Sequence, residues 1–237
     1  MARTLEQSRQ WMQVGSDLVA DALANFDERD FAVESQLPGW TRKHLIAHLA
    51  ANGDAIGNLI HWAATGEVTP MYSSPEARAT DIEIGSRKSG SELTLWFGES
   101  AGKLNAGMSA LTAEQWGNEI VTAQGRTVPA SETPWMRSRE VMIHAVDLDA
   151  GIEFDDLPKE FLLALCDDIV TKRAGITGST AITLVSETSD EWTLPGSGDA
   201  VQVTGSLAAI AAYLAGRQYS GLTASSDDGV PAIPAWL

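Results

Sequence analysis

The sequence is poor in cysteine and in basic residues, and both shortages restrict what the protein can be. Among 237 residues there is one cysteine, Cys166, so no disulfide can form within the chain. Lysine and arginine number 16 against 32 acidic residues, which gives a formal net charge of −16. Because binding to phosphate backbones or anionic membrane surfaces needs a basic face, we expect neither as a partner. An anionic small substrate would have to be captured locally, by a metal ion or a few arginines.

Long apolar runs are lacking as well. No stretch of about 18 apolar residues occurs, so no transmembrane helix is predicted. The segment from Met1 to Gln7 is polar and lacks the apolar core of a signal peptide. We therefore expect a cytoplasmic protein, and we expect it to be a monomer. The apolar fraction of 44% over 237 residues suffices for one large domain or two small ones.

The first part of the chain is predicted to be helical. Apolar periodicity and helix caps indicate helices at residues 4–25, 41–64, 82–111 and 134–150. Residues 26–37 and 65–79 are expected to be loops, and a short strand-like stretch covers residues 116–132. An all-α bundle of four helices is the simplest architecture for residues 1–152. Such bundles build metal sites from side chains that project inward from facing helices.

The composition changes after Gly151. Residues 153–158 resemble a linker, and residues 159–173 are predicted to form a helix. Short runs rich in β-branched residues follow at 181–186, 191–194 and 200–204, and a hairpin turn is expected at residues 196–198. A further helix is predicted at residues 206–215. Residues 153–237 are therefore predicted to be a small α+β domain with a mostly antiparallel sheet.

Glu140 and His144 form the most informative pair in the sequence. Four residues apart on a predicted helix, they share one face, where a carboxylate and an imidazole can bind one metal ion. The surrounding segment is otherwise apolar, so leaving either group unpaired there would be costly. His48, in the predicted helix 41–64, is our candidate for a third ligand. Two histidines and one carboxylate leave a coordination position open, as catalytic zinc sites do, whereas structural zinc sites normally have four protein ligands.

Other interpretations of this pattern remain open. A Glu–His pair at this spacing can simply lie on a solvated helix face. His44 or Asp147 could supply a fourth ligand and make the site structural, or Asp147 could accept the second ring N–H of His144. The same ligand set forms the facial triad of non-haem iron oxygenases, although no β-rich frame surrounds it here. Neither a His-Glu-x-x-His motif nor a glycine-rich phosphate loop is present.

The remaining reactive residues are ambiguous. Cys166 lies among leucines in a predicted helix, so we expect it in the core and expect any catalytic thiol to come from outside. Arg217 follows the last predicted helix, where it could satisfy free carbonyls or bind a carboxylate in an interdomain cleft. Other arginines that could contact an anion, or could be plain surface charge, are Arg78, Arg126, Arg137 and Arg139.

Several stretches of the chain resemble the mycothiol-dependent maleylpyruvate isomerase family. They are GWTRKHLIAHLAAN (39–52), HWAATGEVTPMYSSPEAR (61–78), TAQGRTVPASETPWMRSREVMIHAVDL (122–148) and GSLAAIAAYLAGR (205–217), spread over nearly the whole chain. The resemblance implies a DinB-like four-helix bundle followed by a domain like the sterol-carrier-protein fold. It also implies a zinc ion held by His48, Glu140 and His144, a catalytic Arg217, and mycothiol as the thiol cofactor.

The resemblance further implies an activity. The family isomerises maleylpyruvate, a small dicarboxylate, to fumarylpyruvate in the gentisate pathway. A thiolate would add to the cis alkene, the resulting single bond would rotate, and the thiolate would leave. Zinc would deprotonate the thiol, and its open position would hold the mycothiol sulfur or water. Arg217 would stabilise the developing enolate or bind a substrate carboxylate. A mycothiol S-transferase and a non-enzymatic zinc- or thiol-binding module are the alternatives.

Overall fold

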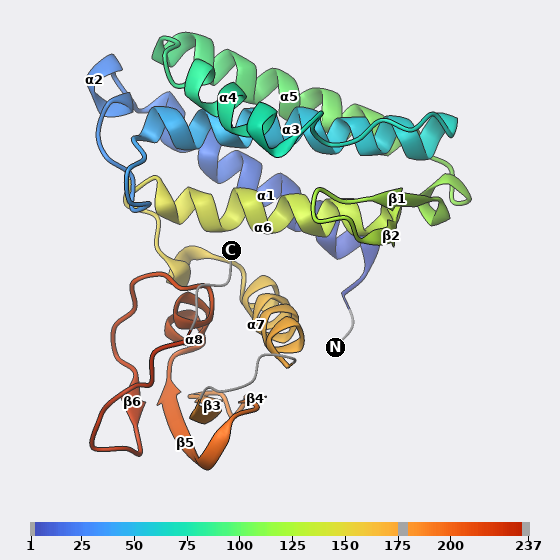
Figure 1. Cartoon of the computed structure of the whole chain (residues 1–237). Helices are drawn as coiled ribbons and strands as arrows, with labels where there is room; N and C mark the ends of the chain where they lie inside the picture. The colour runs from blue at the N-terminus through green and yellow to red at the C-terminus, as the bar shows by residue number, and fades with distance from the viewer. Residues whose placement is uncertain (1–2, 175–179, 234–237) are drawn as a thin grey trace. The chain divides into compact units, whose positions relative to one another are not determined.

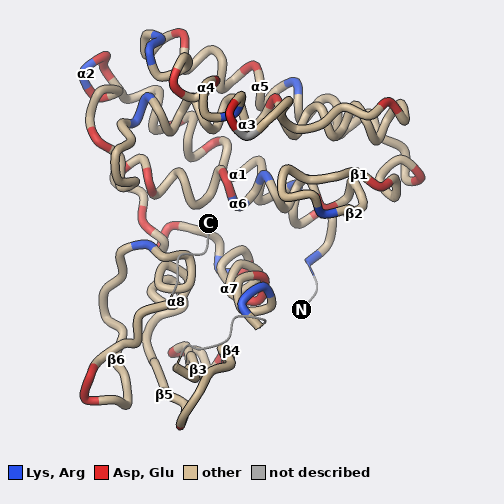
Figure 2. Tube along the Cα trace, in the orientation of Figure 1, with Lys and Arg blue, Asp and Glu red and all other residues tan. Residues whose placement is uncertain are grey.

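The computed structural model describes residues 3–174 and 180–233, and its chain packs into two compact units (Figure 1). The first unit is Thr4–Ile152, and the second contains Glu153–Leu237. None of the helices among the described residues has both the length and the apolar character needed to cross a bilayer. Acidic positions outnumber basic ones and are interspersed with them along the trace (Figure 2).

Helices dominate the first unit. They are α1 (Leu5–Ala24), α2 (Glu28–Phe31), α3 (Arg42–Thr65), α4 (Pro75–Gly85), α5 (Gly90–Ala110) and α6 (Thr133–Asp147). Helix α3 packs against α5, α1 packs against α6, and α3 also contacts α4 and α6. A two-stranded antiparallel sheet, β1 (Glu119–Val121) with β2 (Thr127–Pro129), lies between the 3-10 helices η1 (Gln115–Gly117) and η2 (Ala130–Glu132).

Local sequence accounts for where these helices begin. Thr4 caps α1 through a capping box with Gln7, and Thr41 begins α3 through a similar box with His44. Pro134 occupies the first turn of α6, where its missing N–H costs no hydrogen bond. The predicted helices at residues 4–25, 41–64 and 134–150 are therefore present, with α6 ending slightly earlier than expected.

Helices α1 and α6 approach each other closely at Gly15. A Cβ atom at this position would lie 2.5 Å from Cγ2 of Val141 and 3.0 Å from the backbone nitrogen of Met142. Apolar side chains fill the space on either side of this contact, including Met12 and Val19 of α1. The absence of a side chain at Gly15 thus fixes how near α6 lies to α1.

Three sequence predictions in the first unit were wrong in detail. Residues 82–111 form two helices, because Ser89 starts a new capping box with Glu92 and begins α5 at Gly90. The predicted loop at residues 65–79 ends early, because Ser74 caps α4. The predicted loop at residues 26–37 also contains the short helix α2, which Asp27 caps.

The second unit combines helices with one sheet. Its elements are η3 (Phe154–Asp156), α7 (Lys159–Arg173), β3 (Thr180–Ser186), β4 (Glu191–Leu194), β5 (Ser197–Gly205), α8 (Leu207–Leu214) and β6 (Thr223–Ala224). The strand order is β4-β3-β5-β6. Strand β3 is antiparallel to β4 and parallel to β5, while β5 is antiparallel to β6. Helices α7 and α8 pack against each other, and both contact the sheet.

The hairpin predicted at residues 196–198 was wrong. Strands β4 and β5 do not pair with each other, because they lie on opposite sides of β3. Residues of β5 pair instead with β3 in parallel register, for example Val203 with Leu184. The turn residues therefore carry the chain from one side of β3 to the other, and the sheet is antiparallel except at its central pair.

Candidate metal centre

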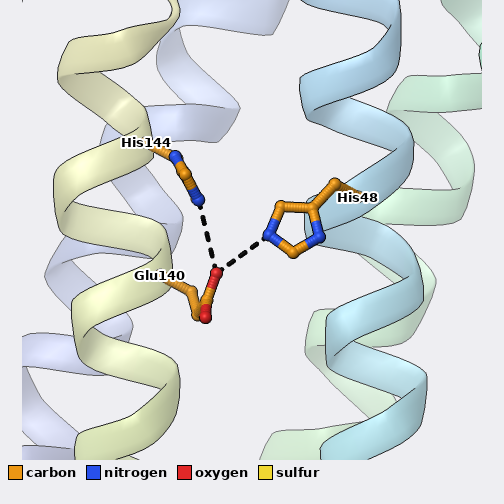
Figure 3. A group of neighbouring side chains, drawn as sticks. All are labelled: His48, Glu140 and His144. Atoms are coloured by element: carbon orange, nitrogen blue, oxygen red, sulfur yellow. Dashed lines mark hydrogen bonds and ion pairs between the residues drawn. The ribbon is translucent and has the colours of Figure 1, made fainter. Parts of the chain in front are cut away.

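The three residues predicted as metal ligands come together between two packed helices. His48 projects from α3, and Glu140 and His144 project from successive turns of α6 (Figure 3). Nε2 of His48 lies 2.9 Å from Oε2 of Glu140, and Nε2 of His144 lies 3.3 Å from the same oxygen. One ligand atom from each residue lies within 4.8 Å of the others. The predicted convergence of α3 and α6 at these side chains is thus observed.

The arrangement fits a zinc ion in both donor type and spacing. Zinc binds imidazole nitrogen and carboxylate oxygen at about 2.0–2.2 Å, which places neighbouring ligands of a tetrahedral ion roughly 3.3–3.6 Å apart. The observed separations of 2.9 and 3.3 Å from Glu140 need only small side-chain adjustments to reach this spacing. The His48 side chain is 5% exposed and the Glu140 side chain 27%, so the cluster is shielded but reachable through Glu140.

Asp147 orients one of the histidines. Its carboxylate oxygen Oδ2 accepts a hydrogen bond from Nδ1 of His144 over 2.7 Å, and the residue is fully buried. Because Asp147 holds a proton on Nδ1, loss of the second ring proton would leave Nε2 of His144 as the nitrogen that can bind a metal ion. The hydrogen bond that the sequence suggested for Asp147 is therefore present, and Asp147 is not part of the ligand cluster.

His44 is also engaged away from the cluster. Its Nδ1 accepts a hydrogen bond from the backbone N–H of Thr41 over 3.3 Å, and its Nε2 lies 3.8 Å from Glu83. The cluster that the described residues form therefore holds three protein ligands, and neither proposed fourth ligand joins it. This is the ligand count of a catalytic site with an open position.

Burial and mutual hydrogen bonding set the protonation of the cluster. Burial by itself raises the pKa of Glu140, but hydrogen bonds from His144 and His48 outweigh it and hold that pKa well below its usual value. Burial lowers the pKa of His48. Burial also lowers the pKa of His144, but hydrogen bonds to Asp147 and Glu140 outweigh this effect and raise that pKa above its usual value. The cluster therefore favours an anionic Glu140 and a neutral His48, and a metal ion would have to compete with a proton for His144.

Further polar side chains surround His48. Arg78 of α4 places Nη2 3.4 Å from Nδ1 of His48, and its guanidinium carbon lies 6.0 Å from the centre of the Tyr72 ring. The Tyr72 side chain interacts with both Arg78 and Asn52. The sequence had left Arg78 among several possible surface charges and had missed Tyr72 and Asn52. The signal available for Arg78 and Tyr72 was their position in or beside the long connection at residues 65–79.

A comparison with known protein families decides the family. Residues 13–149 match the family model described as the mycothiol maleylpyruvate isomerase N-terminal domain. The chain belongs to the mycothiol-dependent maleylpyruvate isomerase family. No curated protein sequence matches the chain significantly.

Solved structures of that family are similar over the whole length of this member. A crystal structure of the mycothiol-dependent maleylpyruvate isomerase is 43% identical, with a TM-score of 0.93, and the match covers 99% of this chain and 98% of that one. A mutant of the isomerase with one histidine replaced by alanine is 42% identical, with a TM-score of 0.92 and the same coverage. The similarity thus includes both units of this family member.

The other residues singled out in this family member lie in varied surroundings. Arg137 is buried and bridges α6 to α3, donating from Nη1 to the carbonyl of Leu49 over 2.7 Å and to Asn52 over 2.8 Å. Its burial lowers the pKa of the guanidinium to about 10. Arg126 is exposed, and Arg139 lies 5.8 Å from the centre of the Trp135 ring.

Arg217 and Cys166 both belong to the second unit. Arg217 is half-buried just beyond α8, and its Nη1 donates to the carbonyl of Ala215 over 2.9 Å. One of the two roles predicted for Arg217, satisfying a carbonyl at the helix end, is therefore observed. Cys166 is fully buried in α7, and this burial raises the pKa of its thiol far above the usual value. The prediction that Cys166 is a core residue is confirmed.

Proposed function

We propose that this protein is a zinc- and mycothiol-dependent cis–trans isomerase that converts maleylpyruvate to fumarylpyruvate, the reaction used in gentisate breakdown, by thiolate addition, bond rotation and elimination. The observation that carries the proposal is the convergence of His48, Glu140 and His144 within 4.8 Å, in a chain similar over 99% of its length to a mycothiol-dependent maleylpyruvate isomerase. Three ligands and an accessible edge suit an ion that must accept a further ligand from solution.

Each residue of the cluster has its own part in holding that ion. His48 and Glu140 approach from facing helices, so the site depends on the packing of α3 against α6. His144 is held in the required tautomer by Asp147. Zinc bound by these residues would keep the mycothiol sulfur in its thiolate form. Because Cys166 is buried and protonated, the chain does not supply a competing nucleophile from that position.

Arg217 is our candidate for the catalytic cation. A guanidinium has five N–H donors, so the observed bond to Ala215 is compatible with a second partner. We assign it either to the negative charge that develops on the substrate ketone oxygen or to a substrate carboxylate. Its position in GSLAAIAAYLAGR (205–217), one of the stretches that resemble the family, supports this assignment.

The architecture is part of the same proposal. Residues 1–152 would be a DinB-like four-helix metal-binding bundle, with α1, α3, α5 and α6 as its long helices. Residues 153–237 would be a domain like the sterol-carrier-protein fold, and the enzyme would act as a monomer. The division of the chain between Ile152 and Glu153 supports the boundary between the two domains.

Two variants test the separate roles of Arg217 and the metal ligand His144. Arg217→Ala should keep one zinc per chain and lose on the order of 100- to 1000-fold in turnover, because it removes a donor aimed at developing charge. His144→Ala should lose both zinc and turnover. Metal analysis and loss of the cis alkene are the measurements. Loss of zinc from Arg217→Ala, or iron in place of zinc in the wild type, would contradict the proposal. Consumption of thiol without isomerisation would indicate an S-transferase.

A further inference from the structure

Arg78 is a cation beside the metal ligands that forms no ion pair with a carboxylate among the described residues. It comes from the first turns of α4, which packs on α3, and its side chain is half-buried. Its polar neighbours are Nδ1 of His48, at 3.4 Å, and the side chain of Tyr72. A half-buried guanidinium with only neutral partners is well placed to accept an anion.

The contact between Arg78 and His48 depends on which ring nitrogen of His48 carries the proton. Nε2 of His48 lies 2.9 Å from the Glu140 carboxylate, so the proton belongs on Nε2 and the lone pair of Nδ1 can accept a hydrogen bond from Arg78. A neutral histidine that binds a metal through Nε2 must carry its proton on Nδ1. The N–H groups of Arg78 would then face another N–H, and Arg78 would need a different acceptor.

We propose that in the metal-loaded protein Arg78 binds a carboxylate of the substrate next to the ligand cluster. The inference rests on the proposed function, which supplies a dicarboxylate substrate at this site. The Tyr72 ring, whose centre lies 6.0 Å from the guanidinium carbon of Arg78, helps to hold the guanidinium in place. With a formal charge of −16 over the whole chain, an anionic substrate also needs a local cation near the metal, and Arg78 supplies it.

The test compares zinc-loaded wild type with Arg78→Gln and a matched control, Arg87→Gln. Arg87 follows the C-terminal end of α4 and is exposed, so both variants lose one positive charge from the same region. Calorimetric titration with maleate, a cis-dicarboxylate without the ketone, measures carboxylate binding apart from turnover. Competition with a chelator measures the zinc affinity of each variant.

Maleate should bind on the order of 10- to 100-fold more weakly to Arg78→Gln than to the wild type, because a charge-assisted hydrogen bond is lost. Arg87→Gln should match the wild type, and Arg78→Lys should recover part of the loss. Zinc should bind Arg78→Gln at least as tightly as the wild type, since a neighbouring positive charge is removed.

Equal maleate affinity in the wild type and Arg78→Gln would overturn the assignment, and so would an equal loss in Arg87→Gln. A tenfold loss of zinc affinity in Arg78→Gln would also overturn it, because Arg78 would then support His48 instead of binding substrate. If the proposed function itself were wrong, the result would differ: the wild-type protein would bind zinc and maleate but show no mycothiol-dependent isomerisation.

Discussion

Replacing Asp147 by Asn should weaken zinc binding without unfolding the protein. Asp147 is fully buried and accepts a 2.7 Å hydrogen bond from Nδ1 of His144. An asparagine fits the same space but is neutral, and hydrogen bonds to charged acceptors are roughly twice as strong as those to neutral ones. If the amide turned its NH₂ toward Nδ1, it would favour a proton on Nε2, the atom that must bind the metal.

The expected size of the effect follows from the position of Asp147 behind a ligand. Removing such an outer partner typically costs on the order of 10- to 100-fold in metal affinity, which is about 1.4–2.7 kcal/mol. Competition with a chromophoric chelator measures this difference directly. The titration is best done at alkaline pH, because the pKa of His144 is raised and its proton competes with the metal at lower pH.

Asp149→Asn is the matched control for this experiment. Asp149 is exposed, lies two residues further along and has φ of 54°, a conformation that asparagine tolerates well. Both variants change the net charge equally, but only Asp147 contacts His144. Unchanged zinc affinity in Asp147→Asn, or an equal loss in Asp149→Asn, would refute the orienting role of Asp147. Far-UV circular dichroism of the metal-free proteins checks that both are folded.

Two further predictions concern stability and reactivity. Gly15→Ala should lower the free energy of unfolding by about 1–3 kcal/mol, because the new Cβ would overlap Val141. Gly57 of α3 has open space around it, so Gly57→Ala should raise the free energy of unfolding by about 0.5–1 kcal/mol. Denaturant unfolding measures both, and a stabilised Gly15→Ala would show that α1 and α6 are not in close contact. The Cys166 thiol should stay unreactive toward a thiol reagent until the protein unfolds, since it is buried and protonated. Rapid labelling of the native protein, or loss of turnover in Cys166→Ala, would contradict this.

Short-range sequence spacing was enough to predict some residues of the site, whereas the place of others depended on how the helices pack. Glu140 and His144 were recognisable because helical spacing alone places them on one face. His48 needed tertiary information, since nothing in its own helix shows that α3 packs against α6. Arg78 was only one of four arginines considered as anion contacts and Tyr72 was not considered, because their place beside His48 depends on α4, a short helix in a region expected to be partly loop.

The fold, too, could be predicted only where local sequence decides it. Helices α1 and α3, which begin at capping boxes, were predicted nearly to the residue, and so was α7. The parallel pairing of β3 with β5 was missed, because turn residues at 196–198 indicate a change of direction but not which strand the chain joins next. Long-range pairing of this kind is decided by the whole sheet.

The central claim is that an ion held by His48, Glu140 and His144 serves a thiol-dependent isomerisation. The most direct test is turnover of maleylpyruvate with and without mycothiol, on zinc-loaded protein and on protein stripped by a chelator. We predict isomerisation only when both zinc and mycothiol are present, restored to the stripped protein by adding zinc. Full turnover without either one, or none with both, would contradict the account.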